Sequence, residues 1–234
     1  MDMTSFWAEV DSKIAKFDLL CHPFYIAWTK GELTPADLKM YATEYYRHVE
    51  AFPDYLGALE SRLPEGKTRL VVEENRRDEL GALSADKRPH SDMWLDFAEG
   101  VGADPEQVKA HEPMSAVSSL IDKFRTVSKE GSTLEALVSY YAYESQIPRL
   151  AKEKAIGLKK LYGAAPTTYK YFSIHATADI EHTRDWRELI SEEIAANPEG
   201  RQLAVNTAEE VAQSIWQVLD QVESRRMEAK ELAN

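Results

Sequence analysis

The stretch His175-Ala-Thr-Ala-Asp-Ile-Glu-His182 carries two histidines and an aspartate at positions 175, 179 and 182. In an α-helix, at about 100° per residue, Asp179 lies roughly 40° from His175, and His182 lies roughly 20° from it on the other side. The pattern predicts a helix that turns these three side chains towards a hydrophobic core. The same stripe continues into apolar residues in both directions: Tyr171, Phe172, Trp186, Leu189 and Ile190.

Ionisable side chains in a core need partners, because an unpaired buried charge costs several kcal/mol. A bound metal ion would satisfy all three side chains at once. A trio of polar groups that hydrogen-bond to one another inside a helix bundle would also satisfy them. This stretch alone leaves both interpretations open.

A second inward-facing acid lies on the helix expected to follow Ser132, where Ser-Thr-Leu-Glu has the form of a capping box. We expect this helix to run to about Tyr162. Pro148 cannot donate a hydrogen bond to the carbonyl of Glu144, so the helix should bend or open there. A carboxylate at such a distortion, facing an HxxxDxxH helix, is typical of a metal ligand. The apolar stripe around Glu144 comprises Leu137, Tyr140, Tyr141, Ile147, Ala151 and Ala155.

A third contribution comes from the segment DELGALSADKRPHSDMW, residues 78–94. His90 begins an inward stripe that continues into Met93, Trp94 and Phe97. Glu79 lies in the last turn of the preceding helix, expected to run to about Leu83, and Glu44, Glu73 and Glu74 compete with it for the same role. The candidate metal ligands are therefore Glu79, His90, Glu144, His175, Asp179 and His182.

This ligand set suits two divalent ions. Two such ions carry +4 and three carboxylates carry −3, which one bound hydroxide would balance. Carboxylates can bridge two ions about 3.5–4 Å apart, and imidazoles suit iron, manganese or zinc. Helix-bundle cores commonly hold centres of this kind.

Helical patterns extend along nearly the whole chain, and no convincing strand or repeat is present. We predict a single all-α domain over residues 1–234, a bundle of seven or eight helices whose last dozen residues fray. Thr167 or Thr168 should cap the helix that holds residues 175–182, and Thr207 should begin the last helix with a second capping box. Another helix is expected over 35–51, with a stop or bend near Pro53 and a continuation to 63. The remaining expected helices are 66–83, one beginning at 90, a short one beginning at 105, and 115–129. A loop is expected at 84–89.

Charge and composition exclude several function classes. The formal net charge is −12, which argues against nucleic acid and against an anionic membrane surface as partners. The chain has one cysteine, Cys21, so no internal disulfide can form. No signal peptide and no apolar run long enough to span a membrane are visible. We expect a cytoplasmic protein.

Six tyrosines are expected to cluster around the metal ligands: Tyr41, Tyr45, Tyr46, Tyr140, Tyr141 and Tyr143. Core packing explains most of them. A tyrosine beside an oxygen-activating metal centre can also be oxidised, so some of them are candidates for chemistry.

The segments HPFYIAWTKGELT, YESQIP and HATADIEH together resemble the family of the chlamydial protein associating with death domains and its bacterial relatives. The resemblance covers nearly the whole chain. It implies a haem-oxygenase-like fold, shared with pyrroloquinoline quinone synthesis oxidases and thiaminase-like proteins. It also implies two metals, iron–iron or manganese–iron, with dioxygen and an external reductant as co-substrates, and a homodimer.

The resemblance further implies an unusual synthesis of para-aminobenzoate for folate, in which the enzyme consumes its own side chains. Tyr25 in HPFY matches the sacrificed tyrosine, Lys154 matches the amino donor, and Tyr143 matches a further family tyrosine. From its own surroundings, KEKAIGLKK, Lys154 is typical of a surface lysine. The interval from Glu79 to His90 is longer than in the chlamydial member, which loosens the alignment of Glu79.

Two other functions are compatible with the ligand set. One is an oxidase that acts on an external small molecule, and the other is a protein-interaction module with a structural metal site. A thiaminase needs a nucleophilic cysteine in its pocket, and Cys21 belongs to an early loop, so that function is disfavoured.

Overall fold

In the computed structural model, which describes residues 2–83 and 87–232, all regular structure within these ranges is helical, as predicted. There are more helices than the seven or eight expected, partly because the N-terminal segment forms helices of its own. Short 3-10 turns lie at Leu19–Cys21 and Pro198–Gly200. The α-helices are α1 (Met3–Ala15), α2 (Pro23–Lys30), α3 (Pro35–Arg62), α4 (Lys67–Glu79), α5 (His90–Gly100), α6 (Pro105–Ala110), α7 (Ser115–Glu130), α8 (Thr133–Glu144), α9 (Ile147–Lys160), α10 (Lys170–Ala196) and α11 (Arg201–Leu232).

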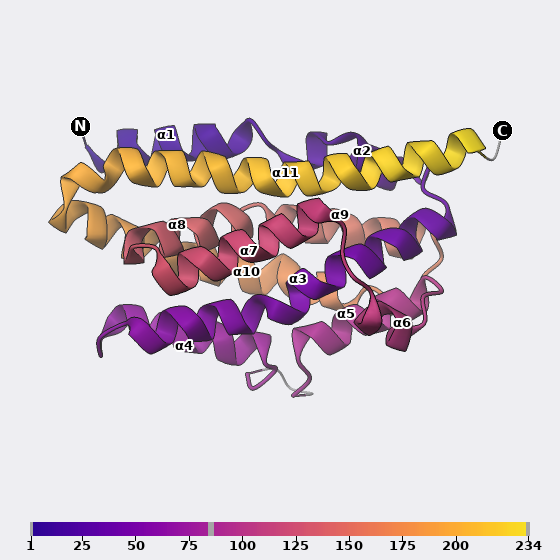
Figure 1. The fold of residues 1–234 in the computed structure, drawn as a ribbon, viewed down its shortest axis with the longest axis horizontal. Helices are drawn as coiled ribbons and strands as arrows, with labels where there is room; N and C mark the ends of the chain where they lie inside the picture. Colours follow the sequence, from indigo (N-terminus) through magenta and orange to yellow (C-terminus); the bar gives the residue numbers. More distant parts are fainter. Residues whose placement is uncertain (1, 84–86, 233–234) are drawn as a thin grey trace.

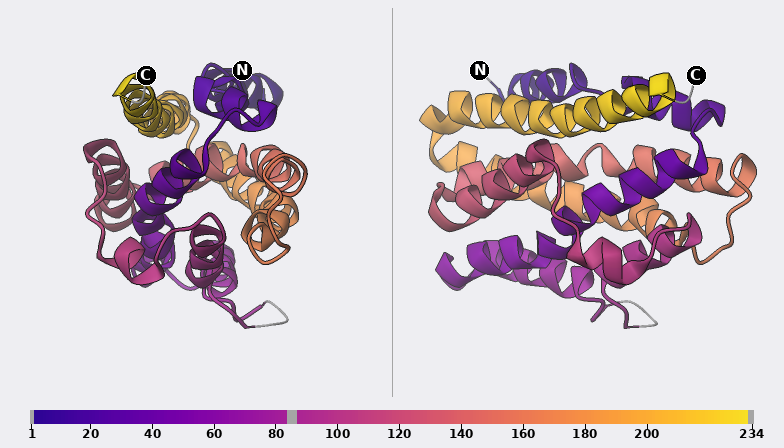
Figure 2. Two further views of the ribbon diagram at one scale, coloured as in Figure 1. Left: turned by 90° about the vertical axis from the view of Figure 1, so that its right-hand side faces the viewer. Right: turned by 45° about the vertical axis from the view of Figure 1, so that its right-hand side comes forward.

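The helices form three tiers (Figures 1 and 2). Helices α1, α2 and α11 form one outer tier, and α4, α5 and α6 form the opposite one. Between them, α10 packs against α8 and α9, while α3 contacts α4, α5 and α7. None of the helices in the described part of the chain is long and apolar enough to cross a membrane.

The stripe predicted for residues 175–190 does face the core. His175, Asp179 and Trp186 are buried, and so are Leu189 and Ile190. Each large apolar side chain removed from water stabilises the fold by about 1.5–3 kcal/mol, so the orientation of α10 is strongly specified.

The Ser132 capping box is present, but the helix it begins does not run to Tyr162. It ends at Glu144, and α9 begins at Ile147, so the opening predicted from Pro148 is confirmed and the single long helix is wrong. Because Pro148 has no N–H, it cannot donate the helical hydrogen bond to the Glu144 carbonyl, and the helix opens at that point. The break leaves Glu144 as the last residue of α8.

Two predicted helix starts are wrong, and Pro53 does not stop α3, which continues to Arg62. Helix α10 begins at Lys170 without a side-chain cap. Thr168 is instead buried against Gly100, with its Oγ1 2.1 Å from where a β-carbon would stand. Thr207 lies inside α11, because the helix interruption at Pro198–Gly200 already lets that helix begin at Arg201. The predicted fraying region is helical as far as Leu232.

A tight turn after α4 sets the positions of Glu79 and His90. Gly81 has a φ of +76°, in the left-handed region, and a β-carbon there would lie 2.3 Å from the backbone of Arg88. Only glycine fits this close approach without strain. The turn precedes the predicted loop at 84–89. Residues 84–86 of that loop lie outside the described residues.

We predict that Gly81→Ala destabilises the protein by about 1–3 kcal/mol, because the new methyl group meets backbone atoms and the conformation is strained. Thermal unfolding followed by circular dichroism measures this. Gly102→Ala is a matched control, since Gly102 also has a positive φ of 90° but no atom within 4 Å of where its β-carbon would stand. Equal losses in the two variants would show that the close approach to Arg88 contributes nothing.

Candidate metal centre

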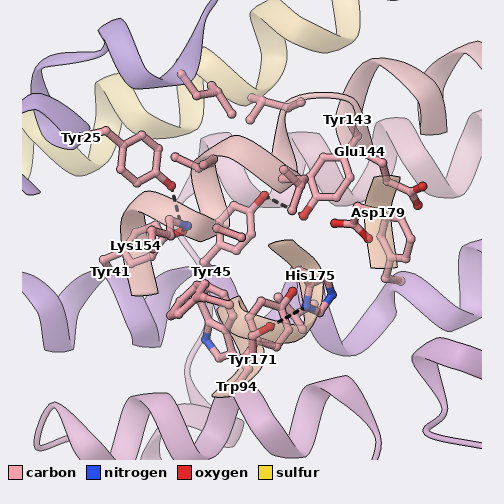
Figure 3. A pocket seen from close by; sticks show the side chains of 18 of the residues that line it. Tyr25, Tyr41, Tyr45, Trp94, Tyr143, Glu144, Lys154, Tyr171, His175 and Asp179 are labelled. Carbon is pink, nitrogen blue, oxygen red and sulfur yellow. Dashed lines mark hydrogen bonds between the residues drawn. The ribbon is translucent and has the colours of Figure 1, made fainter. Parts of the chain in front are cut away.

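Four helices bring the six predicted ligands together in the core, and four of them line one end of a cavity there: Glu79, Glu144, His175 and Asp179. Figure 3 labels the last three. Five of the six are buried, whereas the side chain of His182 is 15% exposed. The six are Glu79 at the end of α4, His90 at the start of α5, Glu144 at the end of α8, and His175, Asp179 and His182 on α10.

Glu79, His90 and His175 form the first half of the centre. Each offers one ligand atom within 4.8 Å of the other two, an arrangement that could hold a metal ion. Glu79 Oε2 lies 3.0 Å from His90 Nδ1, and Oε1 lies 3.8 Å from His175 Nε2. His175 Nδ1 donates to the carbonyl of Tyr171 at 2.8 Å, which fixes the ring and leaves Nε2 directed at Glu79.

Glu144, Asp179 and His182 form the second half. His182 Nδ1 lies 3.4 Å from Asp179 Oδ1 and 4.0 Å from Glu144 Oε2. Glu144 is oriented by two donors from the protein. Trp186 Nε1 donates to its Oε2 at 2.5 Å, and Asn75 Nδ2 lies 3.5 Å from its Oε1.

The pKa values show how strongly these groups depend on one another. Burial by itself disfavours the protonated imidazoles, but the neighbouring carboxylates outweigh it, raising the pKa of His175 to about 9 and that of His182 to about 10. Burial raises the pKa of the Glu79 carboxyl, yet the charges of His90 and His175 outweigh it and hold that pKa well below its usual range. Burial also raises the pKa of Glu144.

This donor set fits a bound metal better than a self-contained polar cluster. Three imidazoles and three carboxylates are the ligands that iron and manganese take in proteins. His90 is fully buried, and its Nε2 has no hydrogen-bond partner among the described residues. A closed network would satisfy that nitrogen, since buried polar atoms are nearly always paired.

The acids that compete with Glu79 in the sequence lie elsewhere. Glu44 is buried, but it accepts hydrogen bonds from the backbone N–H of Met114 and from Arg225, each at 2.8 Å. Glu73 is half-buried and Glu74 is exposed, and neither lines the cavity. Only Glu79 lies beside His90 and His175.

The cavity next to the centre is narrow, with a volume of about 40 Å³. That is room for a few water-sized molecules. Tyr41, Tyr45 and Tyr143 line it, as the sequence led us to expect. Tyr46, Tyr140 and Tyr141 do not, because they hydrogen-bond to Glu50, Ser128 and Asp11 on other faces of their helices.

Tyr25 and Lys154 lie at the other end of this cavity (Figure 3). Lys154 is buried, and its Nζ donates to Tyr41 Oη at 2.6 Å. Tyr41 Oη is in turn 3.0 Å from Tyr25 Oη, and Lys154 Nζ lies 4.9 Å from the centre of the Tyr25 ring. Burial holds the pKa of Lys154 well below its usual range. The interpretation of Lys154 as a surface lysine is therefore wrong.

Tyr143 connects the two ends. It precedes Glu144, and its hydroxyl accepts a hydrogen bond from Tyr45 at 3.2 Å. Tyr45 stacks on Tyr41 with 5.8 Å between ring centres. A continuous row of tyrosines therefore links the candidate metal centre to Tyr25 and Lys154.

Three polar residues of this region were not predicted from the sequence. Asn75 and Asp78 on α4 approach Glu144 and His182, respectively. His48 is fully buried between the rings of Tyr45 and Tyr143, and burial lowers its pKa to about 3. The spacing Tyr41, Tyr45, His48 places this histidine on the same inward stripe of α3, which is the signal that could have identified it.

Residues 39–216 match a family described as iron-containing redox enzymes. The chain belongs to this family. It is 36% identical to the 4-aminobenzoate synthase of Chlamydia trachomatis over 217 residues, which are 92% of this chain and 91% of that protein. The resemblance noted in the sequence is thereby confirmed.

Solved structures agree on the fold. A protein of unknown function with a haem-oxygenase-like fold from Shewanella denitrificans superposes with a TM-score of 0.78 at 20% identity, covering 97% of this chain and 94% of that one. A CADD-like protein of unknown function from Nostoc punctiforme has a TM-score of 0.73 at 15% identity, covering 95% and 98%. This member of the iron-containing family therefore has the haem-oxygenase-like fold.

We predict that metal binding to the metal-free protein releases protons at pH 7, because His175, His182 and Glu144 carry raised pKa values and must lose a proton to bind an ion. Affinity should accordingly rise with pH from 7 towards the pKa values of these three groups. Calorimetric titration with Mn²⁺ in buffers of different ionisation enthalpy gives the number released, about three. A heat that is identical in every buffer would mean that all three groups are already deprotonated.

Proposed function

We propose that this protein makes 4-aminobenzoate in an oxygen-dependent reaction at a two-metal centre, with the ring taken from Tyr25 and the nitrogen from Lys154. The observation that carries the proposal is the arrangement of these two side chains around Tyr41, in the same cavity as the candidate ligands. Two divalent ions, iron–iron or manganese–iron, would supply the binding and reduction of dioxygen, with electrons from an external reductant.

The atoms of the product support a tyrosine as the source. 4-Aminobenzoate consists of a six-carbon ring and one carboxyl carbon, and a tyrosine side chain has the same seven carbons. Its formation requires cleavage of the Cα–Cβ bond of Tyr25 and oxidation of Cβ to a carboxylate. The ring hydroxyl leaves as water when Nζ of Lys154 bonds to the ring carbon that carried it, and the Cε–Nζ bond then breaks by oxidation of Cε to an aldehyde. Dioxygen provides the oxidising equivalents for both Cβ and Cε.

The surroundings of Lys154 suit it as the nitrogen source. A lysine amine attacks only when uncharged, and removal from water is one of the ways in which proteins favour that form. Aromatic rings enclose the amine, and the centre of the Phe172 ring is 5.0 Å from Nζ. The hydrogen bond to Tyr41 holds Nζ near the ring of Tyr25 and away from solvent.

The size of the cavity argues against an external organic substrate. A volume of about 40 Å³ admits dioxygen and a few waters. Sites for small organic ligands typically enclose several hundred Å³. Cys21 is exposed and does not line the cavity, so a thiaminase is not supported either.

We predict that Lys154→Ala abolishes 4-aminobenzoate formation while metal content per chain stays unchanged, because Lys154 touches none of the six ligands. Product is measured by liquid chromatography after iron and manganese loading and exposure to oxygen with reductant. Lys152→Ala is the matched control, since Lys152 lies on the same helix but is exposed. Undiminished product from Lys154→Ala would rule out this lysine as the amino donor.

We also predict that the reaction changes the chain covalently and irreversibly. Intact-mass analysis before and after exposure to oxygen should show loss of one tyrosine side chain together with loss of the Lys154 amine, and peptide mapping should place the two changes at Tyr25 and Lys154. Tyr25→Phe should show neither the loss nor product, whereas Tyr46→Phe, away from the cavity, should behave as wild type. Repeated turnover on an added substrate with an unchanged chain mass would contradict self-consumption and favour an external substrate.

A further inference from the structure

The centre is enclosed, so metal ions need a route to it. Of the six candidate ligands, five are buried, and His182 is the one whose side chain retains appreciable exposure, at 15%. A second cavity, of about 240 Å³, lies on the outer side of His182 between α4 and α10. It is separate from the narrow cavity that Tyr25 and Lys154 line.

This outer cavity has the character of a cation site. Four acids line it: Glu74, Asp78, Glu181 and Asp185. Of these, Asp185 already pairs with Arg184 at 3.3 Å. Among the described residues that line the cavity there is no lysine or arginine. The four acids outnumber the imidazole of His182, which is the basic group among these lining residues, so the potential of the cavity is negative and concentrates cations from solution.

An unpaired buried oxygen provides an independent indication of a ligand. Asn75 lines the outer cavity and is only 2% exposed, yet its Oδ1 has no hydrogen-bond partner among the described residues. The other branch of the same amide, Nδ2, faces inward to Glu144 at 3.5 Å. An amide oxygen is a usual ligand for a divalent cation. Without a ligand or another hydrogen-bond partner, a buried amide oxygen destabilises the fold.

His182 also faces both sites. Its Nδ1 lies 3.4 Å from Asp179 Oδ1 in the inner centre, and its Nε2 lies 3.6 Å from Asp78 Oδ2 in the outer cavity. His182 thus places one ring nitrogen on each side of the boundary. An ion held by Asp78 outside would be adjacent to a ligand of the inner centre.

We propose that the outer cavity is a loading site, where Asp78 and Asn75 Oδ1 first bind a divalent cation that His182 then transfers to the inner centre. The inference rests on the proposed two-metal centre, since it supplies the ions for that centre. It assigns Asp78 a role in metal acquisition and none in the chemistry at Tyr25.

Uptake of Mn²⁺ by the metal-free, full-length protein tests this. Loss of the free Mn²⁺ electron paramagnetic resonance signal gives both the rate of uptake and the final amount bound per chain. We expect Asp78→Asn to slow uptake at least tenfold and to leave the final amount unchanged. Asp78→Glu, which keeps a carboxylate, should restore most of the rate.

Glu73→Gln is the matched control, because it removes one half-buried acid from the same helix but does not line the outer cavity. It should take up Mn²⁺ at the wild-type rate. An unchanged rate in Asp78→Asn overturns the loading site. So does an unchanged rate with less Mn²⁺ bound, because Asp78 would then only position His182.

The same samples separate this inference from the proposed function. If wild-type protein binds no Mn²⁺, both the two-metal centre and the loading site are wrong. If Mn²⁺ uptake follows the expected pattern but oxygen exposure with iron and reductant yields no 4-aminobenzoate, the proposed function fails and the loading site stands.

Discussion

The enclosure of three carboxylates and three imidazoles in a helix-bundle core is the constraint on which the rest of the structure depends. None of these groups could be buried alone without a cost of several kcal/mol, so each needs the others, and the helices that carry them must meet at one place. Two backbone interruptions make this possible. The turn at Gly81 brings His90 back to Glu79, and the break after Glu144 ends α8 at the centre.

Burial disfavours the charged forms of the candidate ligands, and it has the same effect on the amine of Lys154 at the other end of the cavity. Lys154 lies among aromatic rings with one hydrogen bond, to Tyr41, and burial holds its pKa well below the usual range. Packing thus favours the uncharged form of this amine without a basic partner beside it. Tyr41, Tyr45 and Tyr143 line the wall between this amine and the candidate centre, so one narrow cavity has a buried amine at one end and the candidate ligands at the other.

Local periodicity predicted the helical fold, the inward face of α10 and the opening at Pro148, because each depends on residues close in sequence. Local periodicity gave wrong or ambiguous predictions where contacts between residues far apart in the sequence determine the structure. Thr207 has a good capping sequence, but the helix interruption upstream starts α11 six residues earlier, and Thr168 is buried against Gly100. Glu79 could not be separated from Glu73 by spacing alone, since the turn at Gly81 decides which acid meets His90. Lys154 looked like its exposed neighbour Lys152 until the family resemblance singled it out.

The proposed consumption of Tyr25 would set a demand on the stability of the fold. Tyr25 is buried on the eight-residue helix α2, so losing its side chain would leave a void like that of a large-to-small core substitution, which costs about 3–5 kcal/mol. Domains typically have about 5–15 kcal/mol of stability, so a loss of this size takes up a large share of it but leaves all except the least stable domains folded. The ligands come from α4, α5, α8 and α10, none of which includes Tyr25. If Tyr25 is the consumed residue, as proposed, its void would open on a short outer helix that carries none of the candidate ligands.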